Sequence, residues 1–175
     1  MAEPSIPLTT AQVAALMRAT AATFVVEAEA LGVAALRWHP APGQWCVNEV
    51  LGHLIEAERL GSAGRIRRII EQPGCRLESW DQLEVAQARS DCARDGVELA
   101  HELAALLEEN VRLVEGLTRE QFGLSGVHDA VGELRISDLL HRWVDHEREH
   151  IRQALANVRA YVWPHMGNAQ RLADE

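Results

Sequence analysis

Apolar residues recur three and four positions apart along four long stretches of the chain, which is the pattern of helices that bury one face. In the first stretch, Val13, Met17, Phe24 and Leu31 share such a stripe. Ser90 has the chemistry of a helix N-cap and is expected to begin the third helix. The four helices are predicted from Thr9 or Thr10 to about Leu36, from Cys46 or Val47 to about Glu71, from Ser90 to about Leu117, and from about Ser137 to just before Pro164.

Three glycines, Gly52, Gly61 and Gly64, interrupt the second predicted helix. Each costs about 1 kcal/mol relative to alanine in a helix interior. Such a cost is tolerated best where a neighbouring helix packs closely, or where the step from Gly61 to Ser62 bends the axis.

Two long connections separate the last three helices. Residues 75–89 are expected to hold a turn of helix around Leu83 to Ala88, and residues 118–136 are rich in glycine. Because apolar and polar residues nowhere alternate over more than four positions, no strand is expected. The predicted fold is all-α, a four-helix bundle with long connections between helices 2 and 3 and between helices 3 and 4. A simple up-down bundle with tight turns is disfavoured.

The length of the chain bounds its domain organisation. A chain of 175 residues normally forms one domain, so we expect residues 1–175 to be a single unit with its core in residues 8–162. The pattern leaves open whether the two ends, Met1–Leu8 and Pro164–Glu175, are ordered.

The charge of the chain disfavours several classes of partner and reaction. Twenty-six acidic residues outnumber 17 basic ones, and the formal charge of -9 argues against a nucleic-acid or anionic-membrane partner. All the basic residues are arginines. The lack of lysine excludes Schiff-base chemistry on a lysine and the phosphate-binding loop that needs one.

The three cysteines, Cys46, Cys75 and Cys92, match neither a zinc motif nor a redox motif, and an odd number is unusual for a disulfide framework. No apolar stretch is long enough to span a bilayer, and Met1–Leu8 lacks the pattern of a secretory signal. These features predict a cytoplasmic protein.

The histidines supply the candidate chemistry. His146 and His150 lie four apart on the fourth predicted helix, which stacks their imidazoles one turn apart on a stripe with Leu139 and Trp143. They can share one metal ion, or they can be ordinary histidines at the edge of the core. A third ligand from another helix would favour the metal, because zinc sites with three protein ligands leave a fourth position open. His53, in the second predicted helix, is the best candidate, although a single interior histidine is more often structural.

Two motifs resemble those of a known family. Residues 45–54 read W-C-V-N-E-V-L-G-H-L, which resembles the W-S-x-x-E-x-x-x-H-L signature of the DinB-like superfamily. Residues 146–153 read H-E-R-E-H-I-R-Q and resemble its H-x-x-x-H-x-x-Q signature. His128 and Gly132 match the H-x-x-x-G linker before its last helix. The resemblance covers most of residues 9–160.

The resemblance implies a four-helix bundle, often homodimeric, that holds a divalent metal on His53, His146 and His150. Members of the superfamily include S-transferases that use bacillithiol and isomerases that use mycothiol, and others are described as metal-dependent hydrolases. The leading hypothesis is therefore a metal-dependent enzyme acting on a small molecule. It would activate a low-molecular-weight thiol for transfer to an electrophilic substrate or, slightly less favoured, a water molecule for hydrolysis. Zinc, nickel and iron all suit three imidazoles.

Two alternatives stay open: a non-catalytic homodimeric bundle with a structural or sensory metal site, and a protein that binds no metal.

Cys46 departs from the family's serine, which weakens the helix cap but leaves the ligand positions unchanged. Glu49 is expected to complete a capping box, with a fourth-ligand role as the lesser option. Gln153 is an interhelical amide or an outer-shell partner of a ligand, and His128 is a lesser candidate for the pocket mouth. Core or pocket-wall positions are expected for Trp45 and Trp143, and ordinary surface or packing positions for His39, His101, His141 and His165.

Overall fold

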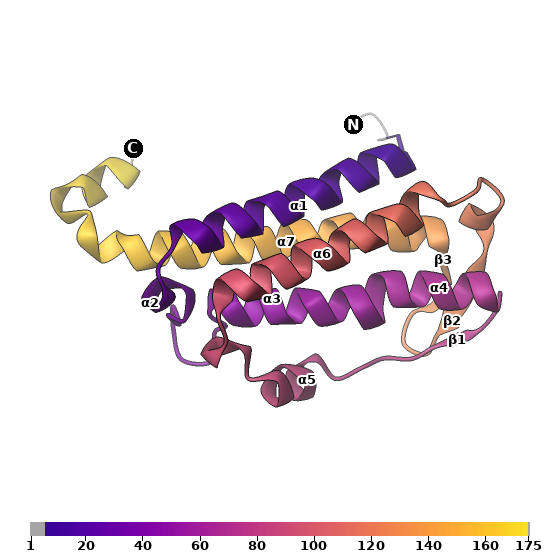
Figure 1. Ribbon diagram of the computed structural model, residues 1–175, viewed down its shortest axis with the longest axis horizontal. Helices are drawn as coiled ribbons and strands as arrows, with labels where there is room; N and C mark the ends of the chain where they lie inside the picture. Colours follow the sequence, from indigo (N-terminus) through magenta and orange to yellow (C-terminus); the bar gives the residue numbers. More distant parts are fainter. Residues whose placement is uncertain (1–5, 175) are drawn as a thin grey trace.

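The computed structural model describes residues 6–174, which are mostly helical (Figure 1). The long helices are α1 (Thr10–Ala30), α3 (Val47–Glu56) continuing into α4 (Ala63–Glu71), α6 (Gly96–Glu115) and α7 (Ile136–Val162). The shorter elements are α2 (Val33–Leu36), the π-helix η1 (Ala57–Ser62), β1 (Arg76–Leu77), α5 (Gln82–Arg89), η2 (Asp91–Ala93), η3 (Gln121–Gly123), β2 (Ser125–His128), β3 (Gly132–Arg135), η4 (Trp163–His165) and η5 (Gly167–Asp174).

The long helices form a four-helix bundle, as expected. Helices α6 and α7 each pack against both α1 and α3, so α1 and α3 lie diagonally across the bundle. Successive helices α1 and α3 are therefore not neighbours, which confirms that this is not a simple up-down arrangement. The core is built from side chains that the four helices turn inward, among them Met17, Leu51, Leu54, Leu103, Leu107 and Trp143.

The first helix begins where the pattern predicts it. The Thr9 hydroxyl accepts the backbone N–H of Gln12, and the Gln12 side chain accepts the N–H of Thr9, so two otherwise unpaired donors are satisfied. The expectation that this helix continues to Leu36 is wrong. The chain becomes extended at Leu31, and α2 forms a separate turn after Gly32.

The second predicted helix is continuous in direction but changes its winding at η1, where the backbone is π-helical. Two of its three glycines, Gly52 and Gly64, are explained by close approaches, whereas Gly61 is not. A Cβ atom added at Gly52 would lie 1.8 Å from Oδ2 of Asp91, and one added at Gly64 would lie 2.1 Å from the carbonyl oxygen of Arg59. Gly52 is therefore required by a close neighbour, as expected, but that neighbour is the short turn η2 and not another long helix.

Ser90 does not cap the third long helix, contrary to expectation. Its φ of 52° places it in the left-handed region, and α6 begins six residues later with the Asp95 carboxylate accepting the N–H groups of Val97 and Glu98. The buried carboxylate of Asp91 draws the intervening chain against α3. The expected turn of helix before Ser90 is present as α5.

The prediction that no strand occurs is wrong for three short strands at one end of the bundle. β1 pairs in parallel with β2, and β2 pairs antiparallel with β3, with Val127 opposite Glu133. Gly132 adopts a φ of +80° at the turn between β2 and β3. The strands are too short for an alternating pattern to be recognisable in the sequence.

The C-terminal segment after α7 is ordered as the 3₁₀ turns η4 and η5, which answers one question that the sequence left open. Residues 1–5 and 175 lie outside the described residues. Within residues 6–174, no helix combines the length and the apolar character needed to cross a lipid bilayer.

Candidate metal site

Three histidines converge between α3 and α7. The Nε2 atom of His146 lies 3.1 Å from Nε2 of His53 and 3.1 Å from Nε2 of His150. The two helices pack against each other, and the spacing of four residues places His146 and His150 on the face of α7 that meets His53. The structure thus brings together all three of the histidines singled out from the sequence.

Hydrogen bonding alone does not account for this cluster. The Oε1 atom of Gln153 lies 2.9 Å from Nδ1 of His150 and can only accept, so the neutral His150 ring carries its proton on Nδ1 and presents a lone pair at Nε2. Nε2 of His146 can donate to only one of its two neighbours. At least one of the two short contacts would therefore bring lone pairs or protons together, whereas a cation between the rings satisfies all three nitrogens.

The spacing also fits a shared ion. Metal–nitrogen bonds of about 2.1 Å in tetrahedral geometry separate ligand atoms by about 3.4 Å, close to the distances between these nitrogens. The three imidazoles can thus hold one divalent cation with little movement. Imidazole is a common ligand for zinc, nickel and iron, so the donor set does not choose among them.

The surroundings keep the rings in the neutral form that a metal requires. Burial, with smaller contributions from the charges of His150 and Arg142, lowers the pKa of His53 to about 4. Burial also lowers the pKa of His146 to about 3, again with a contribution from its two histidine neighbours. The pKa of His150 is lowered by burial as well.

Two indole rings flank His53. The ring of Trp45 lies 5.1 Å from it, centroid to centroid, at a tilt of 45°, and Trp80 stacks at 6.0 Å with 23° between the planes. Nδ1 of His53 is buried and has no hydrogen-bond partner among the described residues. The indoles therefore fix the ring by contact and exclude water from one side of it.

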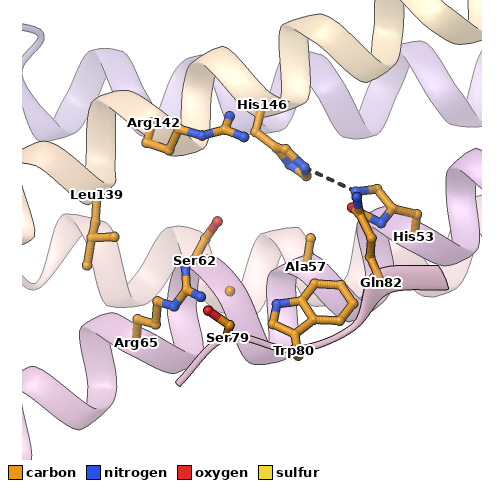
Figure 2. A pocket seen from close by; sticks show the side chains of 11 residues that line it. His53, Ala57, Ser62, Arg65, Ser79, Trp80, Gln82, Leu139, Arg142 and His146 are labelled. Atoms are coloured by element: carbon orange, nitrogen blue, oxygen red, sulfur yellow. Dashed lines mark hydrogen bonds between the residues drawn. The ribbon is translucent and has the colours of Figure 1, made fainter. Parts of the chain in front are cut away.

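A cavity of about 280 Å³ opens beside His53 and His146 (Figure 2). Arg65 of α4 and Arg142 of α7 project into this space from opposite sides. Among residues 6–174, no carboxylate lines the cavity, whose remaining polar side chains are Ser62, Ser79 and Gln82. Arg142 is also paired with Asp145 at 3.2 Å, and Asp145 and Glu149 line an adjoining cavity. Within the cavity itself the two guanidinium groups favour an anionic ligand.

Contacts with the chain after α4 and with β2 hold Arg65 in place. Its guanidinium donates to the carbonyl oxygen of Glu78 and lies 3.2 Å from Nε2 of His128. Burial lowers the pKa of Arg65, and the nearby charge of Arg142 acts in the same direction. His128 thus supports a residue that lines the cavity but does not line the cavity itself. Its lesser candidacy for the pocket mouth is therefore not supported.

The structure also places the other residues that the sequence analysis singled out near the site. Gln153 contacts His150, as the outer-shell interpretation proposed. Glu49 accepts the backbone N–H of Cys46 at 2.8 Å and is not part of the three-histidine group, which favours its capping role. Trp143 is a fully buried core residue whose Nε1 donates to Glu58. Trp45 instead lines the adjoining cavity on the other side of His146, together with His150.

The sequence did not reveal Arg65, Trp80 or Arg142 as site residues. Arg142 lies four residues before His146 and therefore on the same helical face, a signal that was available. Trp80 sits in an irregular connection, and Arg65 is one of several arginines in its helix. The position of Trp80 depends on how the chain between α4 and α5 folds back over the site.

Comparisons with known proteins identify the family and the fold of the chain. A sequence model of the DinB superfamily matches residues 16–154, while no curated protein matches the chain. YfiT from Bacillus subtilis, described as a probable metal-dependent hydrolase with an unusual four-helix bundle topology, is 18% identical, with a TM-score of 0.79 over 93% of this chain and 94% of its own. A conserved protein from Enterococcus faecalis is 16% identical, with a TM-score of 0.67 over 89% of this chain and 98% of its own. Likenesses at such identities show a shared fold, and since the family match spans most of the sequence, the chain belongs to the DinB superfamily.

Proposed function

We propose that this protein is an enzyme that depends on a divalent metal held by His53, His146 and His150. The observation that carries the proposal is the convergence of three imidazoles, with Nε2 of His146 3.1 Å from Nε2 of His53 and of His150, at the wall of a cavity that a small molecule can enter. Three protein ligands leave one coordination position free, which is the arrangement of catalytic zinc sites, whereas structural sites are closed by four.

A divalent cation at this position supplies a nucleophile at neutral pH, because it lowers the pKa of a water or thiol that coordinates it. The chain's own residues bind and orient. Gln153 holds the His150 ring, Trp45 and Trp80 shield His53, and the guanidinium groups of Arg65 and Arg142 are placed to bind an anionic group of the substrate.

Hydrolysis is the first reaction to test. None of the described residues that line this cavity is a carboxylate, and the two carboxylates beside the histidines, Asp145 and Glu149, line the adjoining cavity instead. A metal held by the three histidines would therefore supply the nucleophile in this cavity without a general base. The similarity in fold to YfiT, described as a probable metal-dependent hydrolase, supports water as that nucleophile. Transfer of a low-molecular-weight thiol to an electrophile is the second candidate, supported by the family resemblance of the motifs.

The experiment is a substrate panel with the metal-loaded protein. Anionic and neutral esters, amides and phosphoesters test hydrolysis, and thiols paired with electrophilic acceptors test transfer, each with zinc, nickel and iron. We expect turnover that is lost in His146→Ala and retained in His101→Ala, which changes an exposed histidine of α6. Arg142→Met should raise KM for anionic substrates more than for neutral ones.

No turnover above the metal-free control across the panel would reject catalysis. If the protein nevertheless binds one metal through the three histidines, the alternative of a structural or sensory site in a non-catalytic bundle takes its place. The homodimer, the cytoplasmic location and the absence of a nucleic-acid partner stay predictions, and sedimentation of the metal-loaded protein tests the first of them.

A further inference from the structure

Four side chains with metal-binding chemistry meet at the other end of α3 from η1. They are His39 from the loop after α2, Cys46 and Glu49 from the start of α3, and Cys92 from η2. Their ligand atoms all lie within 4.8 Å of one another. The sequence gives no hint of this group, because its two cysteines are 46 positions apart in a chain whose cysteine spacings match no zinc motif.

The donor set is one that zinc prefers. Thiolate sulfur, imidazole nitrogen and carboxylate oxygen bind zinc at about 2.3, 2.1 and 2.1 Å, which separates tetrahedral ligands by about 3.3–3.8 Å. The observed ligand atoms, all within 4.8 Å of one another, would therefore have to approach by about 1 Å to bind an ion together. Cys46 is fully buried, Glu49 and Cys92 are partly buried and His39 is exposed, so an ion can enter from the His39 side.

Two of the four side chains are already joined. Oε2 of Glu49 lies 2.9 Å from Nε2 of His39, and the same oxygen accepts the backbone N–H of Cys46. This leaves the other carboxylate oxygen of Glu49 free to coordinate while the helix cap stays intact. The loop that carries His39 is therefore already drawn toward the beginning of α3.

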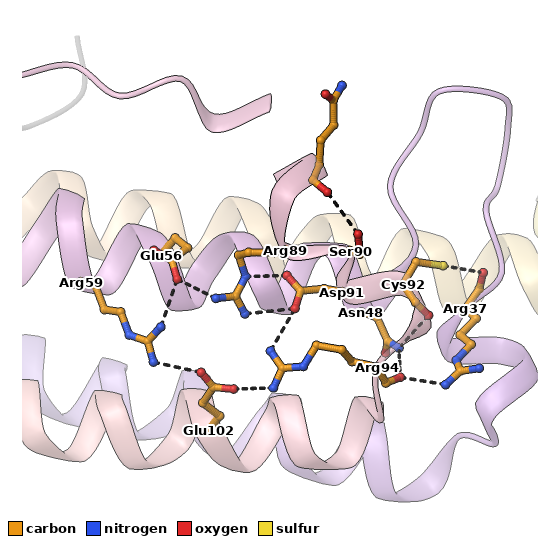
Figure 3. A network of polar contacts seen from close by, with 11 residues as sticks. Arg37, Asn48, Glu56, Arg59, Arg89, Ser90, Asp91, Cys92, Arg94 and Glu102 are labelled. Atoms are coloured by element: carbon orange, nitrogen blue, oxygen red, sulfur yellow. Dashed lines mark hydrogen bonds and ion pairs between the residues drawn. The ribbon is translucent and has the colours of Figure 1, made fainter. Parts of the chain in front are cut away.

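Cys92 is positioned by a rigid frame (Figure 3). The neighbouring Asp91 is paired with Arg89 at 2.6 Å and with Arg94 at 3.1 Å, and it packs against Gly52 of α3. The Cys92 thiol points toward the carbonyl oxygen of Arg37, 3.7 Å away, a weak contact that metal coordination can replace.

We propose that His39, Cys46, Glu49 and Cys92 form a second metal site, a structural zinc site closed by four protein ligands. On binding, each thiol loses its proton to solvent, and the two thiolates and the carboxylate face the charge of the ion. The site ties the loop after α2 to α3 and η2. Because Trp45 adjoins Cys46 and contacts His53, zinc at this site fixes one wall of the three-histidine site.

Cobalt distinguishes the two sites, since only thiolate ligands produce a sulfur-to-cobalt charge-transfer band in the near ultraviolet. The test titrates the reduced, metal-free, full-length protein with Co²⁺. We expect two equivalents to bind and the band to appear. In His53→Ala one equivalent should be lost while the band remains, so this result does not depend on the proposed enzymatic activity.

Cys92→Ser should abolish the charge-transfer band or sharply reduce it. The control is Cys75→Ser, because the third cysteine is buried and lies beside β1, outside this group. His39→Ala removes an exposed ligand without disturbing the core. It should weaken Co²⁺ binding at the thiolate site by more than the roughly 10–100-fold that the loss of an outer-shell partner costs.

Three spectroscopic results would overturn the proposal. They are a wild-type protein that binds Co²⁺ without the charge-transfer band, a band of equal intensity in Cys92→Ser, and a band that disappears in Cys75→Ser. Unchanged affinity in His39→Ala would remove the imidazole from the ligand set and with it the four-ligand site. Recovery of the protein from reducing buffer with a Cys46–Cys92 disulfide, shown by mass spectrometry, would also overturn it.

Discussion

The amide of Gln153 accepts a hydrogen bond from Nδ1 of His150 across 2.9 Å, one turn apart on α7. This bond sets both the orientation and the tautomer of the imidazole, and it directs the Nε2 lone pair at the point where His53 and His146 also converge. A residue that touches neither metal nor substrate thus decides how well the cluster is preformed.

Replacing Gln153 with alanine is therefore expected to weaken metal binding by roughly 10–100-fold while leaving the fold intact. Competition against a chelator of known affinity measures the change. Gln87→Ala, on the exposed surface of α5, is the control. An unchanged affinity in Gln153→Ala would mean that the contact to His150 has no part in metal binding.

Metal removal should lower thermal stability. A ligand present at 1,000 times its dissociation constant adds about 4 kcal/mol to the free energy of unfolding. For a chain of this size, each kcal/mol changes Tm by about 2–4 °C, so a strong chelator is expected to lower Tm by about 10 °C.

His53→Ala should remove the chelator's effect at the three-histidine site, and His101→Ala should preserve it. The comparison is made in Cys92→Ser, so that metal at the thiolate group does not contribute. A chelator shift of less than about 1 °C in protein loaded with metal, or an equal shift with and without His53, would show that these histidines hold no stabilising ion.

Gly52→Ala should be strongly destabilising despite the higher helix propensity of alanine. Its Cβ would lie 1.8 Å from Oδ2 of Asp91, a buried carboxylate held by Arg89 and Arg94 that cannot move without losing its partners. The overpacking cost is expected to be about 3 kcal/mol, measured by urea unfolding.

Gly61→Ala is the matched substitution, because an added Cβ there meets nothing within 4 Å. It should be neutral or stabilising by up to about 1 kcal/mol. Equal effects of the two substitutions would mean that the close approach of η2 to α3 does not explain Gly52.

The buried carboxyl group of Glu58 should make stability fall with rising pH. Burial raises its pKa to about 8, with the nearby charge of Glu147 acting in the same direction, although Asn110 and Trp143 both donate to it. An acid whose pKa is higher in the folded state takes up a proton on folding, so its stabilising contribution is complete below the unfolded pKa of about 4.5 and is lost as the pH rises through about 8.

Glu58→Gln should remove much of this dependence. Urea unfolding of metal-free protein between about pH 6.5 and 8.5 avoids most of the titration of free histidines, whose pKa is near 6.5. Burial also raises the pKa of Glu147 to about 7, so the part due to Glu58 is the difference in slope between the parent and the variant. The variant can be less stable at pH 6.5, because an amide has one acceptor oxygen fewer, but its stability should decline less with pH. A decline as steep as that of the parent would assign the dependence to another group.

Much of the fold and two of the three candidate ligands were accessible from sequence because both depend on periodicity. A repeat of three and four residues defines a helical face, and the same rule places His146 and His150 on one side of α7. Thr9 with Gln12 and the carboxylate of Glu49 mark helix starts by local hydrogen bonds that need no tertiary context. The joining of His53 to the pair came from motif resemblance, not from periodicity.

What the sequence by itself determined is therefore local: four amphipathic helices, the spacing of two histidines, and a charge that disfavours nucleic acid. Tertiary structure alone decided that α1 and α3 lie diagonally, that Arg65, Trp80 and Arg142 surround the cluster, and that Cys46 approaches Cys92. It also decided where α6 begins, because the buried ion pairs of Asp91 override the capping preference of Ser90. Contacts between distant segments depend on which faces bury each other, and a helical period specifies that a face is buried without specifying its partner.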